Sequence, residues 1–150
     1  MTIMAYQYKF ERVMSIKESE KDRLMTEYNE AVQSFEKVGQ QLYEYLKQKE
    51  QLIDEHAVKM RMGLSITDVK QFQLFIDHLE KMIAVYQQKV MSARQTMQLT
   101  ELKLRDKNME VKKFEKMKVK DFRRYKETQK ELESKQMDEV SIQQYMLKGN

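Results

Sequence analysis

Few residues of this 150-residue chain combine the types and the spacing that catalysis requires. The sequence has no Cys, which excludes thiol nucleophiles and disulfide bonds. Its two histidines, His56 and His78, fall at different levels of the helical pairing derived below, so they do not predict a shared metal site. Neither a P-loop, a glycine-rich phosphate cradle nor a nucleophile elbow occurs. We therefore predict that the protein is not an enzyme, binds no cofactor and has no small-molecule substrate.

Basic residues gather in one stretch, residues 112–126, with the sequence KKFEKMKVKDFRRYK. Eight Lys and Arg residues there oppose only Glu115 and Asp121, giving +6 in a chain whose net charge is +4. Nucleic acid is one interpretation, since Lys and Arg neutralise phosphates and aromatic rings stack on bases. The preferred interpretation is a solvated helix face or a surface that attracts an acidic protein. This basic patch comprises Lys112, Lys113, Lys116, Lys118, Lys120, Arg123, Arg124 and Lys126.

The composition indicates long amphipathic helices. The chain has no Pro and three Gly, too few for a domain with many loops, while 35% of its residues are charged and 41% are apolar. No window approaches the roughly 20 apolar residues of a membrane span, and the N-terminal sequence lacks a signal-peptide pattern. Together with the absence of Cys, these features fit a reducing cytoplasm.

The first predicted helix covers about residues 8–62. Apolar residues recur at the a and d positions of an imperfect heptad repeat, and apolar e positions are expected to widen the buried stripe. The a positions are Met14, Tyr28, Phe35 and Leu42; the d positions are Phe10, Leu24, Ala31, Val38, Tyr45 and Leu52; the e positions are Val32, Leu46, Ile53 and Met60; Lys17, Lys21, Lys49, His56 and Lys59 interrupt the pattern.

A turn is predicted at about residues 63–65, and a second helix at about residues 66–147. Gly63 can adopt the left-handed conformation that ends a helix, while Ser65 can cap the next one, with Asp68 three residues later. The second heptad pattern is cleaner, with Lys107 as its main flaw, and it weakens beyond Phe114. Its a positions are Ile76, Ile83, Val90, Met97, Leu104 and Val111, and its d positions are Phe72, Leu79, Tyr86, Ala93, Thr100 and Phe114.

This order of elements predicts an all-α fold, a long antiparallel two-helix coiled-coil hairpin, as a single domain over residues 1–150. If the turn centres near Gly63, residue i faces about residue 127 − i. The second helix is then longer, and its last ~30 residues extend beyond the start of the first. Gly39, inside the first helix, indicates either a soft point or a close approach, and a soft point is preferred.

Apolar residues just after the turn outnumber what one interhelical seam requires. Phe75 and Met82 occupy g positions and Leu74 an f position, in addition to the a and d residues. They indicate either a wider hairpin core near the turn or an exposed apolar patch for a partner.

Three stretches, in this order and spacing, resemble the FliJ family, the coiled-coil component of the bacterial flagellar type III export apparatus. They are the opening YQYKFERVMSIKESEKD, the middle QFQLFIDHLEKMI and the end SKQMDEVSIQQYM. The resemblance covers essentially the whole chain and is to Bacillus-type members, from which this chain departs by being richer in Lys and Met.

The resemblance implies a shaft and adaptor, since family members form an antiparallel coiled coil similar to the central shaft of rotary ATPases. It implies binding to the hexameric export ATPase, promotion of its ring assembly and activity, contact with the cytoplasmic domain of the membrane export gate, and interaction with export chaperones. It also implies a cytoplasmic protein, peripheral at the cytoplasmic face of the flagellar basal body. By position, it assigns gate contact to Phe75, Leu79, Met82 and Tyr86, and ATPase contact to Met137, Asp138 and Glu139.

Two alternatives to this function stay open. The protein could be a generic structural coiled coil that only forms homodimers. The less favoured alternative is a basic nucleic-acid-binding helical protein, which the charge of residues 112–126 suggests.

Overall fold

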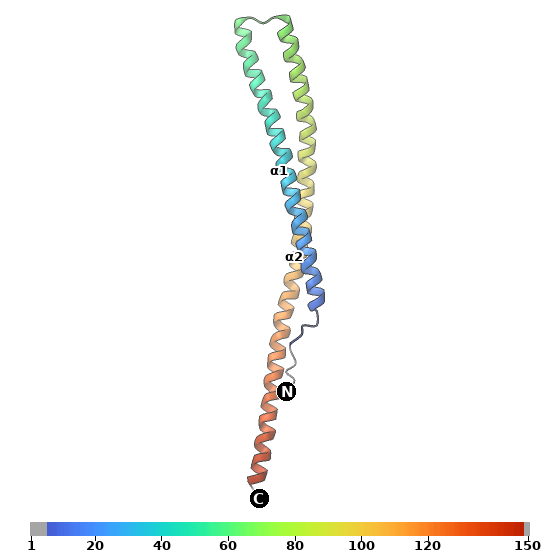
Figure 1. Ribbon diagram of the computed structural model, residues 1–150, viewed down its shortest axis with the longest axis vertical. Coiled ribbons are helices and arrows are strands. Elements are labelled where there is room, and N and C mark those ends of the chain that lie inside the picture. Colours follow the sequence, from blue (N-terminus) through green and yellow to red (C-terminus); the bar gives the residue numbers. More distant parts are fainter. Residues whose placement is uncertain (1–5, 149–150) are drawn as a thin grey trace. The chain divides into compact units, whose positions relative to one another are not determined.

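The computed structural model describes residues 6–148, which form two helices joined by a short connection (Figure 1). Helix α1 spans Glu11–Met62 and helix α2 spans Ile66–Lys148. The helices run antiparallel and pack against each other, so the predicted all-α hairpin with a longer second helix is confirmed. Helix α1 begins at Glu11 rather than at about Tyr8. The residues before it include Tyr6 and Tyr8, which pack on α2 instead of continuing the helix.

The described residues fall into two compact units, each containing a segment of both helices. The turn unit is Arg23–Arg105, and the terminal unit contains the described residues up to Asp22 and from Asp106 onward. That all 150 residues fold as a single domain stays a prediction.

The turn unit buries one narrow stripe from each helix. Ile76, Leu79 and Ile83 of α2 are buried at the predicted a and d positions near the turn. Leu24 and Ala31 of α1 are buried at predicted d positions toward the other end of the unit. Midway along the unit, the rings of Tyr45 and Tyr86 pack with their centroids 5.3 Å apart. These seam residues behave as the heptad pattern predicted, because a pair of helices hides little beyond its a and d side chains.

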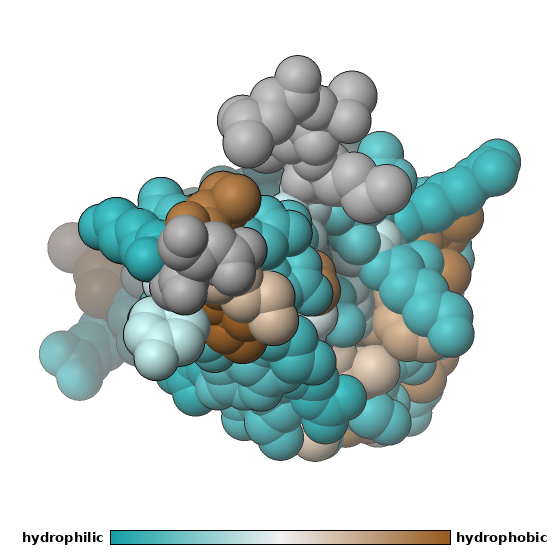
Figure 2. Space-filling model, turned by 90° about the horizontal axis from the view of Figure 1, so that it is seen from below, coloured by the Kyte–Doolittle hydropathy of each residue, from teal (hydrophilic) through white to brown (hydrophobic). Residues whose placement is uncertain are grey.

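The prediction that apolar e positions widen the stripe is wrong for three of its four residues. Leu46, Ile53 and Met60 are exposed, whereas Val32 is half-buried. With only one partner helix and no third layer, a residue at e in α1 points past the edge of α2. At the end of the molecule where α2 finishes, hydrophobic side chains likewise lie among hydrophilic ones at the surface (Figure 2).

The terminal unit pairs the start of α1 with α2 in the predicted register. Lys17 lies 3.2 Å from Glu110 and Lys107 lies 2.7 Å from Glu20, and both pairs satisfy the relation i to 127 − i. Met14 and Val111 are buried between the helices, while every described side chain from Lys130 onward is exposed. The last part of α2 thus extends past the start of α1, as predicted.

The turn has the geometry that its residues favour. Gly63 has a φ of +94°, outside the range that side-chain-bearing L residues adopt easily. Ser65 Oγ accepts a hydrogen bond from the Asp68 backbone N–H at 3.2 Å, which caps α2 as predicted. Gly39 differs, since a Cβ added there would meet nothing within 4 Å. Gly39 is therefore not a site of close approach, and its interpretation as a soft point of α1 stays a prediction.

We expect alanine substitutions at the two glycines to have opposite effects. Gly63→Ala should destabilise the fold by about 1–2 kcal/mol, because a Cβ is strained at positive φ although space is available. Gly39→Ala should stabilise it by about 1 kcal/mol, because Ala favours a helix interior. Urea unfolding followed by circular dichroism measures both, and the same sign for both variants would contradict this account.

Candidate protein-interaction sites

The apolar residues beside the turn divide into a buried set and an exposed set. Phe75 is 59% exposed and Leu74 is 71% exposed, whereas Leu79 is only 7% exposed. Met82 and Tyr86 are half-buried beside the seam. The exposed-patch interpretation therefore holds for Leu74 and Phe75, which we call the turn patch. Of the four residues assigned to the gate, Leu79 belongs to the core and offers a partner almost no surface.

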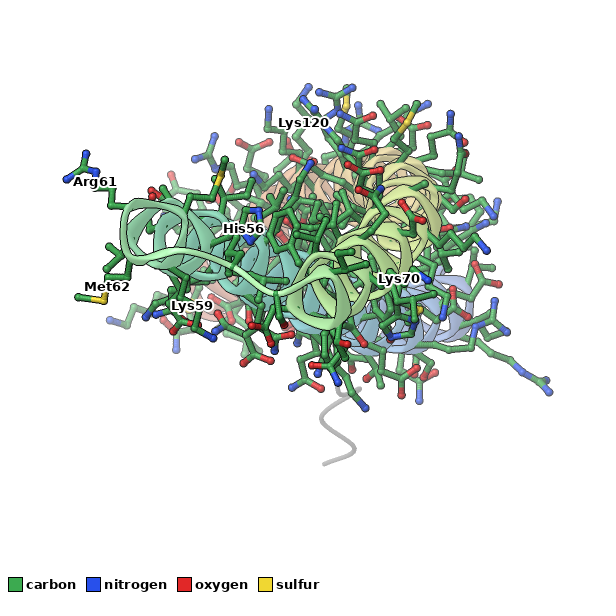
Figure 3. All side chains as sticks on the ribbon, turned by 90° about the horizontal axis from the view of Figure 1, so that it is seen from above. His56, Lys59, Arg61, Met62, Lys70 and Lys120 are labelled. Carbon is green, nitrogen blue, oxygen red and sulfur yellow. The ribbon has the colours of Figure 1, made fainter. Side chains whose placement is uncertain are left out.

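A groove between the helices adjoins the turn patch. Its lining includes His56 and Leu52 of α1, Leu64 of the turn, and Phe72 and Phe75 of α2. His56 points from α1 toward α2 (Figure 3), and its ring stacks on Phe72 with centroids 3.6 Å apart and planes 5° apart. This stacking explains how a histidine fits in an otherwise apolar seam. It also orients the aromatic wall of the groove next to Phe75.

Helix ends at the turn expose further apolar surface. Met62, which closes α1, extends away from the helix (Figure 3) and is almost fully exposed, and Ile66, which opens α2, is also exposed. The heptad pattern did not predict the exposure of Met62 and Ile66, because the two helices are no longer paired at these ends. The turn patch thus lies near other apolar side chains that water covers in the free protein.

The C-terminal part of α2 offers a second exposed surface. Met137 is 68% exposed, and Asp138 and Glu139 are exposed beside it. Leu132, Val140 and other apolar residues of this stretch are exposed as well. The three residues that the resemblance assigns to the ATPase are therefore adjacent on one helix and accessible.

An aromatic clasp formed by residues before α1 was missed from the sequence. Tyr6 donates a hydrogen bond from its hydroxyl to Asp121 Oδ2 at 2.8 Å, and its ring packs against Phe122 and Tyr125 with centroids 4.9 and 5.2 Å away. Tyr8 is buried, with its hydroxyl 3.4 Å from the Phe114 carbonyl oxygen. The alternation of aromatic and polar residues in YQYKF is typical of an extended segment with one buried face, and could have indicated the clasp.

Burial and charge shift the ionisation of the clasp. Burial, followed by the hydrogen bond to Asp121, raises the pKa of Tyr6 to about 12. Burial also raises the pKa of Tyr8. Both hydroxyls consequently stay protonated well above neutral pH, which keeps Tyr6 a hydrogen-bond donor to the Asp121 carboxylate.

Four charged residues form a cluster across the helices of the terminal unit. Lys107 lies 2.7 Å from Glu20 and 3.2 Å from Glu110, and Lys17 contacts both carboxylates, at 3.8 and 3.2 Å. Hydrogen bonds from Lys17 and Lys107 lower the pKa of Glu110. Hydrogen bonds to Glu20 and Glu110 raise the pKa of Lys107. Lys17 and Lys107, which interrupt the heptad pattern, therefore form ion pairs between the two helices.

Most of the basic patch forms an outward face of α2 in the terminal unit. Lys118 instead turns toward α1 and lies 2.9 Å from Glu11, and Lys126 lies over the Phe122 ring, 4.7 Å from its centroid. The other members are exposed: Lys112, Lys113, Lys116, Lys120, Arg123 and Arg124.

The part of the chain that the structure describes carries neither a metal-binding cluster nor a membrane-spanning helix. No group of three or more His, Asp or Glu side chains there could hold a metal ion. No helical stretch of residues 6–148 is long and apolar enough to cross a membrane.

Removing the Glu110 carboxylate should have a pH-dependent effect on stability. Because the folded-state pKa lies below the ordinary 4.5, this carboxylate stabilises fully above pH 4.5, and the stabilisation is lost as the pH falls through the lowered pKa. Glu110→Gln should therefore lower the Tm at neutral pH, and its difference from the unaltered protein should shrink in acid. Thermal unfolding across this pH range measures the effect, with Glu115→Gln as the exposed control on the same helix. A difference that does not change with pH would refute the role of this ion cluster.

The comparisons with known proteins agree with the resemblance that the three sequence stretches carry. A family model described as "Flagellar FliJ protein" matches residues 6–150. The flagellar FliJ protein of Bacillus subtilis (strain 168) is 39% identical over 147 residues, which cover 98% of this chain and 100% of that relative. No solved structure matches the chain. Because both matches extend over nearly its whole length, the chain belongs to the flagellar FliJ protein family.

Proposed function

We propose that this FliJ-family chain serves as a shaft and adaptor of the flagellar type III protein export apparatus. In this role it binds the export ATPase, promotes assembly and activity of its ring, contacts the membrane export gate and interacts with export chaperones. The observation that carries the proposal is the family match over residues 6–150, on a helical hairpin that leaves two apolar surfaces exposed. The protein itself catalyses nothing in this scheme and works peripherally at the cytoplasmic face of the basal body.

The turn patch is the proposed contact with the cytoplasmic domain of the gate. Phe75 is the large exposed aromatic side chain of the region, and truncation of such anchors weakens protein interfaces most. Met82 and Tyr86 supply partly exposed surface on the same helix. Leu79 takes a positioning role, because its burial against α1 holds the segment that carries Phe75.

The C-terminal part of α2 is the proposed contact with the ATPase. Met137 supplies apolar area, and Asp138 and Glu139 supply negative charge that can orient the encounter. A protein that binds the assembled ring more tightly than the separate subunits shifts the population toward the ring. Activation therefore requires no catalytic group from this chain.

Adding the protein at substoichiometric amounts should raise the turnover of the cognate export ATPase. The variant Met137→Ala/Asp138→Asn/Glu139→Gln should need about tenfold more protein for half-maximal activation, since losing an anchor residue costs more than about 1 kcal/mol. Leu132→Ala/Glu131→Gln/Glu133→Gln also removes one apolar side chain and two carboxylates from the same part of α2, and serves as the control. Absence of activation at any ratio, together with a stable homodimer, would favour the generic coiled coil.

Truncating the turn patch should weaken binding to the gate domain without unfolding the helices. Leu74→Ala/Phe75→Ala should raise the Kd about tenfold or more, because both side chains are exposed and carry little of the core. Met91→Ala/Leu99→Ala removes two other exposed apolar side chains of α2 in the same unit and should bind normally. Calorimetric titration measures the Kd, and circular dichroism measures the helicity.

Leu79→Ala provides the complementary test. It should lower stability by about 2 kcal/mol or more, because it leaves a cavity in the seam.

Equal loss of gate binding by the turn-patch variant and by Met91→Ala/Leu99→Ala would contradict the assignment of the gate contact to the turn patch.

A further inference from the structure

The outward part of the basic patch is a continuous cationic ridge that neither helix pairing nor the proposed partners use. We call Lys112, Lys113, Lys116, Lys120, Arg123 and Arg124 the cationic ridge. Val111 is 1% exposed and marks the side of α2 that faces α1. At 3.6 residues per turn, the six cations all lie about 100–220° around the helix from Val111. They line a face about 18 Å long, with Lys120 extending into solvent (Figure 3). Lys120 and Arg124 also line a pocket beside Tyr8 and Phe10, the residues that precede α1.

No carboxylate of the described chain neutralises this ridge. None of its six cations forms an ion pair with a residue in the range 6–148. Asp121 accepts the Tyr6 hydrogen bond, and Glu110 pairs with Lys17 and Lys107. Glu127 does share the ridge face, one turn beyond Arg123, but it forms no ion pair with a ridge cation within residues 6–148. Glu115 is exposed, but it lies about 40° from Val111 and therefore outside the ridge face. Six like charges on one helix face repel one another, so an anionic counterpart lowers their free energy.

The make-up of the ridge fits a diffuse anionic surface better than a protein interface. Four of its six cations are Lys, a residue that is depleted in the cores of protein–protein interfaces. The ridge is convex and has no aromatic anchor. Met109 and Val119 are 64% and 53% exposed and lie on or beside the same face. Apolar side chains among cations suit the boundary between lipid headgroups and acyl chains, whereas a phosphate backbone offers them nothing.

The aromatic rings of this stretch argue against single-stranded nucleic acid. Phe122 and Tyr125 lie on the clasp side of α2 and pack against Tyr6. They are therefore not presented beside the ridge as a platform on which bases could stack.

We propose that the cationic ridge docks this part of α2 on a membrane surface rich in anionic phospholipids. Helix α2 then lies along the bilayer with its Lys and Arg heads at the phosphate level and Met109 and Val119 at the acyl boundary. Each Lys or Arg near such a surface strengthens binding about fivefold. The attraction falls off within a Debye length, so only this outward face contributes, and binding weakens as salt is added. The proposal concerns a face of α2 that the gate and ATPase assignments leave unused, and it does not depend on them.

Co-sedimentation of the full chain with lipid vesicles tests the proposal. The protein should bind vesicles of phosphatidylcholine mixed with phosphatidylglycerol and should not bind pure phosphatidylcholine. Lys112→Gln/Lys116→Gln/Lys120→Gln should weaken the binding about 100-fold, because three cations are lost while Gln preserves helix propensity. Lys37→Gln/Lys47→Gln/Lys70→Gln changes the net charge equally at exposed positions in the turn unit and should bind nearly as well as the unaltered protein.

Three results would overturn the proposal. The first is no binding to anionic vesicles at low salt. The second is an equal loss in both triple variants, which would indicate net charge and not the ridge. The third is tighter binding to duplex DNA or to poly-glutamate than to the vesicles, lost specifically in the ridge variant, which would assign the ridge to nucleic acid or to an acidic protein. Circular dichroism of each variant establishes that the helices are intact.

Discussion

The pairing of two helices along one narrow stripe is the constraint on which the rest of this structure depends. A hairpin has no third layer, so each helix can hide only the side chains that face its partner. Eight of the described apolar residues are buried, and all others share some contact with water. Leu46 and Ile53 are exposed for this reason, and so is Phe75. Because the pairing covers only one stripe of each helix, long faces of both helices remain available for partners.

Polar residues in the stripe set how the helices align. Lys17 and Lys107 each reach a carboxylate of the opposite helix, and His56 stacks on Phe72. A shift of the pairing along the seam would leave these charges opposite apolar side chains, which costs free energy. Long lysine stems can cover apolar surface while their charged ends stay near water, so the stripe tolerates them. The flaws in the heptad pattern therefore specify the register.

Much of the fold was predictable because it depends on local chemistry. Heptad spacing predicted both helices and the buried positions of Ile76, Ile83 and Val111, and Gly63 with Ser65 predicted the turn. The start of α1 at Glu11 and the aromatic clasp were not predicted. They depend on the contact of Tyr6 with Asp121, which lies 115 residues away in the sequence. For the candidate sites, the sequence named the right region near Phe75 but not which residues remain accessible. Residue assignments to the gate and to the ATPase came from the family resemblance, and they stay predictions.

By itself, the sequence determined that the chain forms two long helices and where each helix ends. It also determined that a and d residues meet in the seam, and that positive charge gathers between residues 112 and 126. These properties follow from spacing within one helix and from the preferences of single residues. Only the tertiary structure decided that Phe75 faces water while Leu79 is buried, that Tyr6 and Tyr8 pack on α2, and that Lys118 leaves the basic patch to meet Glu11. Those outcomes depend on which side chains the partner helix covers, and that coverage joins residues more than a hundred positions apart in the sequence.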